Sequence, residues 1–160
     1  MSRTDVFDLG RLRLTAGEGR RLDLQVPLQP MEFSHQRYEV LPALADARLD
    51  VARMTGGGYS LRLRFEAALR GPCMRCLQHA EPRTDVDSRE IDQPGSEADE
   101  LTSEYVSGEE LDLARWANDA LVLALPAGIV TVAGTWHSSG SLHCRPTTNG
   151  DAALSGLPSR

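Results

Sequence analysis

Residues 49–69 have the sequence LDVARMTGGGYSLRLRFEAAL, and this stretch decides the fold. Apolar side chains occupy every second position from Tyr59 to Leu69, and the positions between them are polar from Ser60 to Glu66. A period of two is typical of a strand that buries one face and exposes the other. The three glycines at 56–58 can adopt the positive φ angles of a tight turn. The stretch therefore predicts an antiparallel hairpin with one face exposed to water.

Two further strands are predicted outside this hairpin. Residues 22–26 alternate apolar and polar side chains, as in a half-buried strand. Residues 84–91 form a second candidate strand, in which Ile91 falls out of phase with the earlier apolar positions, as it would after a β-bulge. Residues 29–45 contain two prolines and no sustained period, so we expect a loop with short irregular pieces there.

A single helix is predicted near the end of the patterned region. Apolar residues recur there at helical spacing until Pro126, which cannot continue a helix. Asp112 is placed to cap the first turn. The apolar stripe comprises Leu113, Trp116, Ala117, Ala120, Leu121 and Ala124. Because nothing polar interrupts this stripe, we expect it to pack against the sheet.

The predicted fold class is α+β, a mainly antiparallel β-sheet with one C-terminal helix packed on one face. Residues 1–126 would form one domain, with an acidic, mobile loop at 93–108. Residues 127–160 show no periodicity and are rich in Gly, Ser and Thr, so a disordered or only locally ordered tail is predicted. The expected core contains Leu61, Leu63, Phe65, Trp116 and Leu121.

The charge distribution is uneven along the chain. The formal net charge is −6, and all 17 basic residues are arginine. Residues 1–80 hold 12 Arg against 9 acids, whereas residues 81–120 hold 3 Arg against 13 acids. Affinity for phosphate comes mostly from clustered cations, so an acidic chain of this kind is a poor autonomous binder of nucleic acid. If RNA is involved, we expect a protein partner to help.

Four arginines are candidates for contact with RNA or with a partner protein. They are Arg62, Arg64, Arg70 and Arg75. The alternative is that Arg62 and Arg64 simply form the solvated side of the hairpin strand. There is no interleaved aromatic platform of the kind that readers of single-stranded RNA use.

Cys73 and Cys76 form the sharpest local motif, GPCMRCL at 71–77. Two thiolates at this spacing can bind one metal ion from the same side, so zinc is one interpretation. A redox dithiol is a second, although the βαβ context of thioredoxin-like proteins is missing. A structural pair of small, soft side chains is the third. The chain's further candidate ligands are His79, His137, His143 and Cys144. Their spacing is unlike the second half of a zinc ribbon, so we expect an incomplete site and no cofactor.

No catalytic constellation is recognisable. The chain lacks a phosphate-binding glycine loop, a nucleophile elbow, a paired-histidine metalloprotease helix and a dinucleotide fingerprint. Carboxylates are abundant over 81–112, but the sequence indicates neither burial nor a charged partner for them. Without one of these, a carboxylate does not acquire the shifted pKa that acid–base catalysis needs. We therefore expect a protein that is not an enzyme. No stretch approaches the roughly 20 apolar residues that cross a bilayer, and the N-terminus lacks a signal-peptide core, which together predict a cytoplasmic address.

The order of four sequence segments resembles the YceD family, the large ribosomal RNA subunit accumulation proteins. These segments are GEGRRLDL at 17–24, RGPCMRCL at 70–77, LDL at 111–113 and DALVLALP at 119–126, with the acidic stretch in between. The resemblance covers roughly the first four-fifths of the chain. After Pro126 the chain departs from the family, many members of which continue with several more cysteines.

This resemblance implies a non-enzymatic factor in the synthesis, processing or stability of large-subunit ribosomal RNA. Its partners would be the RNA precursor or assembly proteins, and neither a membrane nor DNA. The only candidate site that carries over from the family is the pair Cys73 and Cys76. The alternative function is a protein-interaction module whose acidic loop docks a basic partner, without a direct role in RNA, and a dithiol oxidoreductase comes third.

Overall fold

The computed structural model describes residues 4–73, 77–93 and 101–125. Within these residues the one α-helix is α1 (Leu113–Ala124), and a short 3-10 helix, η1, spans Leu9–Leu12. The strands are β1 (Val6–Asp8), β2 (Gly19–Pro27), β3 (Met31–Phe33), β4 (Gln36–Leu41), β5 (Leu44–Arg53), β6 (Tyr59–Pro72), β7 (His79–Ala80), β8 (Arg83–Asp92), β9 (Val106–Ser107) and β10 (Glu110–Asp112).

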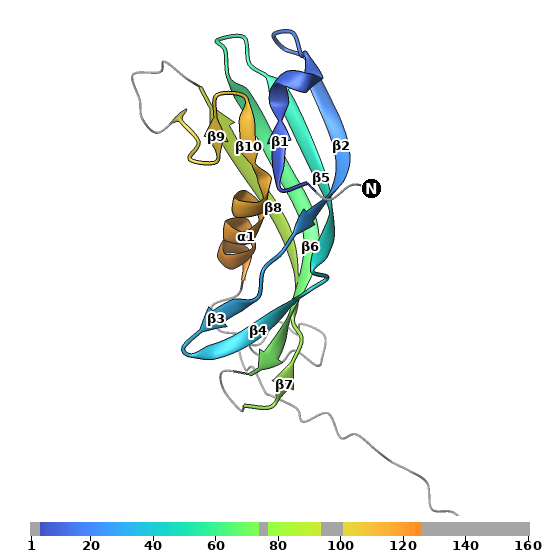
Figure 1. Cartoon of the computed structure of the whole chain (residues 1–160), viewed down its shortest axis with the longest axis vertical. Coiled ribbons are helices and arrows are strands. Elements are labelled where there is room, and N and C mark those ends of the chain that lie inside the picture. The colour runs from blue at the N-terminus through green and yellow to red at the C-terminus, as the bar shows by residue number, and fades with distance from the viewer. Residues whose placement is uncertain (1–3, 74–76, 94–100, 126–160) are drawn as a thin grey trace, which may run out of the picture.

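Strand β6 is the centre of the main sheet (Figure 1). Along its first half β6 pairs with β5 on one side and β8 on the other, and β2 lies outside β5. Along its second half it pairs with β4 and β7, and β3 lies outside β4. A small second sheet joins β1, β10 and β9. Every pairing is antiparallel, and α1 packs beside β8 and β2, so the predicted α+β class is confirmed.

The hairpin that the sequence predicts is present as β5 and β6. Its last cross-strand pair is Arg53 with Tyr59, and the N–H of Met54 donates to the carbonyl of Gly58 at 3.1 Å. Gly57 and Gly58 have φ angles of 86° and 78°, a region that side chains with a Cβ rarely adopt. The three glycines therefore form the tight turn that the sequence predicts.

Strand β8 runs without the predicted bulge. Its register with β6 is continuous from Ala67 opposite Thr84 to Tyr59 opposite Asp92, so the bulge prediction is wrong. Ile91 instead points to the solvent face and is 45% exposed. The core-side positions near this end of β8 are taken by polar residues, among them Glu90, because hydrogen bonds compensate their burial.

The region 29–45 forms a second hairpin instead of the irregular loop that the sequence indicates. Strands β3 and β4 meet at Ser34 and His35, whose φ angles of 49° and 63° are those of a turn that normally uses Asn or Gly. The standard turn signal is therefore absent. Tyr38 anchors the hairpin, since its ring is fully buried and its hydroxyl donates to the carbonyl of Pro72 at 2.8 Å.

The core lies between the main sheet and α1. Leu61, Leu63, Phe65, Trp116 and Leu121 are all buried in one cluster, as predicted. The helix ends before Leu125, which is extended as expected for a residue that precedes proline. Residues 127–160, the predicted tail, lie outside the described part of the chain.

The cap of α1 provides a first test of local stability. The Asp112 carboxylate accepts the backbone N–H of Arg115 at 3.0 Å, which satisfies one of the donors that a helix start leaves open. We expect Asp112→Ala to lower the free energy of unfolding by about 1 kcal/mol in urea titrations. Asp112→Ser, which keeps an acceptor, should lose less than half of that. Equal losses in the two variants would show that the cap contributes nothing.

Candidate functional site: the charged face of the sheet

The face of the sheet opposite α1 is covered by charged side chains. They alternate with the buried residues along β2, β5, β6 and β8, because successive side chains of a strand point to opposite faces. They are Arg21, Asp23, Asp46, Arg48, Asp50, Arg62, Arg64, Glu66, Asp85, Asp87 and Arg89. We call this surface the charged face.

Asp50 is the centre of an ion-pair network on the charged face. The Nε of Arg21 lies 2.6 Å from one carboxylate oxygen of Asp50, and a terminal nitrogen of Arg64 lies 2.5 Å from the other. The hydrogen bond from Arg21, with a further one from Arg64, holds the pKa of Asp50 below its ordinary value. Two guanidinium groups thus share one aspartate as their ion-pair partner.

The Asp50 network should make stability depend on pH. We expect Asp50→Asn to lower the free energy of unfolding by about 1 kcal/mol near neutral pH. Because the pKa of Asp50 is lower in the folded chain than in the unfolded chain, this stabilisation is present above the unfolded pKa and is lost as pH falls through the folded pKa. Urea titrations from about pH 6 to about pH 2 should show the two proteins converging. The control is Asp23→Asn, which removes a single exposed pair with Arg48 and should have a smaller effect. A gap between Asp50→Asn and wild type that does not change with pH would contradict the assignment.

Two more of the arginines singled out in the sequence, Arg62 and Arg70, are also paired. Arg62 donates to both oxygens of Asp87, at 2.7 and 2.5 Å, and this contact lowers the pKa of Asp87. Arg70 lies 3.0 Å from Glu81. Arg75 lies outside the described residues. A guanidinium that already donates to a carboxylate has fewer N–H groups free to bind a phosphate. The paired arginines are therefore better explained as the solvent-exposed side of the sheet than as RNA contacts.

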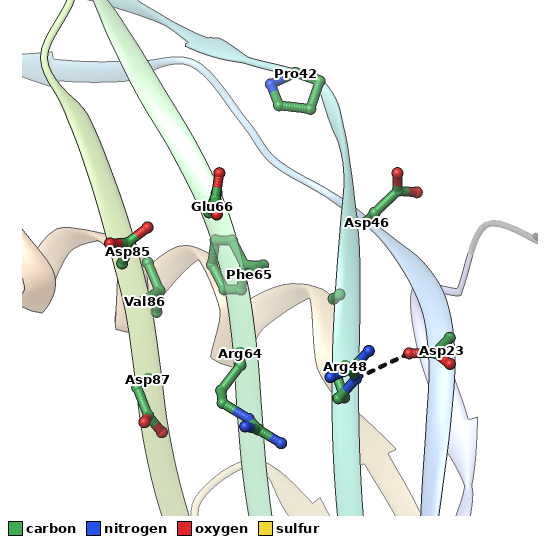
Figure 2. A pocket seen from close by; sticks show the side chains of 11 residues that line it. Asp23, Pro42, Asp46, Arg48, Arg64, Phe65, Glu66, Asp85, Val86 and Asp87 are labelled. Carbon is green, nitrogen blue, oxygen red and sulfur yellow. Dashed lines mark hydrogen bonds and ion pairs between the residues drawn. The ribbon is translucent and has the colours of Figure 1, made fainter.

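A hollow of about 860 Å³ lies on the charged face, where the chain passes from β4 to β5. It is lined by Asp23, Pro42, Asp46, Ala47, Arg48, Arg64, Phe65, Glu66, Asp85, Val86 and Asp87, and we call it the Pro42 hollow. Figure 2 shows Glu66 and Asp85 side by side on neighbouring strands, with Asp46 on the far side of the hollow. Sequence reasoning missed this site, because the three acids come from strands far apart in the chain.

Cys73 is fully buried at the end of β6. Its backbone N–H donates to the carbonyl of Gln78 at 2.7 Å and its carbonyl accepts from the N–H of Leu77 at 2.9 Å, so these bonds join Cys73 to the start of the next described segment. Cys76 lies outside the described residues, so the metal, redox and structural interpretations of the cysteine pair are not tested. Among residues 4–73, 77–93 and 101–125 there is no group of three His, Cys, Asp or Glu side chains that could hold a metal ion.

A cluster of polar residues lies under the start of α1, and the sequence did not indicate it. The hydroxyl of Ser103 donates to Glu90 at 3.2 Å, and the N–H of Ser103 donates to the buried carboxylate of Asp92, also at 3.2 Å. Burial raises the pKa of Glu90, so the expectation that nothing desolvates the carboxylates of 81–112 is wrong for this residue. Within the predicted loop, residues 101–108 include β9 and the buried Ser103, while residues 94–100 lie outside the described part.

Tyr105 and Trp116 complete this cluster. Their rings stack with centroids 6.3 Å apart, and the indole N–H of Trp116 donates to the hydroxyl of Ser88 at 3.0 Å. Burial, together with the negative charges of Asp119 and Glu104, raises the pKa of Tyr105 to about 12. The tyrosine is therefore neutral at physiological pH and serves as a packing residue in this arrangement.

Comparisons with protein-family models, with curated protein sequences and with solved structures found no match. No helix in the described residues is long and apolar enough to cross a membrane. The function therefore has to be inferred from the chain's own motifs and from the chemistry of the charged face.

Proposed function

We propose that this protein is a non-catalytic, cytoplasmic factor in the synthesis, processing or stability of large-subunit ribosomal RNA, and that it acts through a protein partner. The observation that carries the proposal is the resemblance of four segments to the YceD family. These segments contribute to β2, to the end of β6 and to α1 with its cap, all within one antiparallel domain. Four matching segments within one domain support a family resemblance more strongly than the same segments would if they lay in separate domains.

The charges favour a partner-mediated role over direct RNA binding. Arg62, Arg64 and Arg70 each form an ion pair with a carboxylate, and the chain as a whole carries a net charge of −6. Affinity for RNA grows with the number of cations available to phosphates, and few are left on this surface. A protein that carries basic segments of its own would supply the RNA contact.

Deletion of the gene provides the direct test. Ribosome profiles of the deletion strain should show a reduced large-subunit peak, together with a lower ratio of large-subunit to small-subunit ribosomal RNA. Re-expression of the wild-type chain should restore both. A deletion strain with normal profiles and normal ribosomal RNA levels would refute the proposal.

The second candidate is a protein-interaction module that uses the acidic stretch as its docking segment. It is favoured by one observation: the N–H of Gln93 donates to the carbonyl of Leu101 at 2.7 Å, which joins the two ends of the acidic segment 94–100. Its test is the variant Glu97→Gln/Asp99→Asn. Loss of a copurifying protein from RNase-treated lysate, with normal ribosomal RNA on deletion, would support this candidate over the first.

A further inference from the structure

Strand β8 is an edge of the main sheet, because β6 is its one partner among the described strands (Figure 1). The carbonyl of Pro82 accepts from the N–H of Leu69 on β6, whereas the N–H of Gln93 donates away from β6, to the carbonyl of Leu101. In an antiparallel strand both backbone groups of a residue point to the same side, and the sides alternate along the chain. The odd-numbered residues of β8 therefore turn their N–H and C=O groups outward, away from the sheet.

The outward groups of residues 83–91 form what we call the free edge. No backbone hydrogen bond within the described residues reaches them. Helix α1 packs against the core-side face of β8, where Trp116 donates to Ser88, and takes none of these groups. The opposite edge of the sheet, β2, is partly covered, because the N–H of Thr4 donates to the carbonyl of Gln25. A row of unpaired backbone groups like the free edge is a template for another strand.

A second copy of β8 fits the free edge in one antiparallel register. The free edge is symmetric about Asp87, so a two-fold axis at that residue would pair all of it, with Arg83 opposite the partner's Ile91. Each outward residue would exchange two backbone hydrogen bonds with the residue opposite it. An axis at Ser88 would instead set Arg83 against the partner's Gln93, the N–H of which is already bonded.

The charges of the free edge are complementary to themselves in this register. Asp85 and Arg89 form no ion pair within the described residues. Asp85 lies opposite Glu66 on β6, and Arg89 lies opposite Arg62, and like charges in such positions destabilise a sheet. Across the two-fold axis Asp85 would meet the partner's Arg89, and the symmetry would form this contact twice. The outward residues are neutral overall: Arg83, Asp85, Asp87, Arg89 and Ile91.

Charge also excludes the neighbouring register. An axis one residue earlier would set Asp85 against the partner's Asp87. It would also set Arg83 against the partner's Arg89, so both contacts would join like charges. In the favoured register the two Asp87 side chains meet at the axis, but within each chain Arg62 donates to both oxygens of Asp87. The like charges at the axis are therefore offset by a guanidinium from each copy.

We propose that the protein forms a homodimer by antiparallel pairing of β8 with the partner's β8, about a two-fold axis at Asp87. The two main sheets would become one continuous sheet. The partner's Arg89 would stand beside Asp85 at the rim of the Pro42 hollow, so the second copy contributes to the candidate site. A contact along one strand edge is small, and we expect a dissociation constant on the order of 10–100 µM. The dimer is independent of the proposed role in ribosomal RNA.

Sedimentation equilibrium of the purified full chain, from about 1 to about 300 µM, measures the dimer. Asp85→Arg and Arg89→Asp each reverse the contact on both sides of the axis, and each should weaken dimerisation about tenfold. Each also sets unlike charges opposite each other within the chain, at Glu66 or at Arg62, so folding should be retained, which thermal melting checks. The double variant Asp85→Arg/Arg89→Asp exchanges the charges and should return dimerisation to within about twofold of wild type. The control Glu110→Arg reverses an exposed charge on β10 and should also stay within about twofold.

Amide hydrogen exchange shows which edge is used. The N–H groups of Asp85, Asp87 and Arg89 should exchange more slowly as the protein concentration rises, because they would become bonded in the dimer. Those of Arg21 and Asp23, on the edge strand β2, should not change. A chain that is monomeric at the highest concentration, a dimer in which the β8 amides stay unprotected, or a double variant that fails to recover would overturn the proposal.

Discussion

Replacing Trp116 by alanine is expected to lower the free energy of unfolding by about 3–5 kcal/mol. The side chain is only 1% exposed and is one of the largest in the core between α1 and the sheet. Its loss would leave a cavity, remove the stacked partner of Tyr105 and leave the hydroxyl of Ser88 without its indole donor. Urea titration followed by far-ultraviolet circular dichroism measures the change.

Two variants separate the causes of this effect. Trp116→Phe keeps an aromatic ring but lacks the N–H group, so it should lose roughly half as much. Leu123→Ala truncates a neighbouring apolar residue of the same helix that is 84% exposed, and it should change stability by less than about 0.5 kcal/mol. A Trp116→Ala variant no less stable than Leu123→Ala would show that α1 is not packed as described.

Gly58→Ala is expected to destabilise the chain by about 2–4 kcal/mol. Its φ of 78° already disfavours a residue with a Cβ, and the added methyl group would collide with the carbonyl of Asp92 on β8. The backbone cannot move away easily, because β8 is paired with β6 through Tyr59 and Asp92 at this point. The collision should therefore disturb both the β5–β6 turn and the adjoining pairing of β6 with β8.

The neighbouring glycine is a matched control. Gly57 has a φ of 86°, but nothing lies within 4 Å of a Cβ built on it. Gly57→Ala should therefore carry only the conformational cost, about 1 kcal/mol. Thermal and urea unfolding of the two variants should differ by the steric contribution alone. If Gly57→Ala proved as damaging as Gly58→Ala, the close approach of β8 to the turn would be disproved.

Local patterns predicted those elements in which apolar residues occupy one face and polar residues the other. The alternation from Tyr59 to Leu69, the glycine turn and the strand around Leu24 were all identified, because each has a period that burial on one face imposes. The same holds for α1, where the apolar stripe and the Asp112 cap are sequence-local. The β3–β4 hairpin was missed because Ser34 and His35 adopt a turn conformation that their types rarely indicate.

The sequence by itself thus determined the fold class, the central hairpin, the helix and its cap, since these depend on residues within a few positions of one another. Only the tertiary structure decided that Glu90 is partly buried beside Ser103, that Arg62 and Arg64 form ion pairs with aspartates, and that Asp46, Glu66 and Asp85 line one hollow. Which side chains come close together depends on which strands pair and in which register. Pairing is set by the burial of the whole apolar face, and a shift of one residue would move every charge to the opposite side of the sheet.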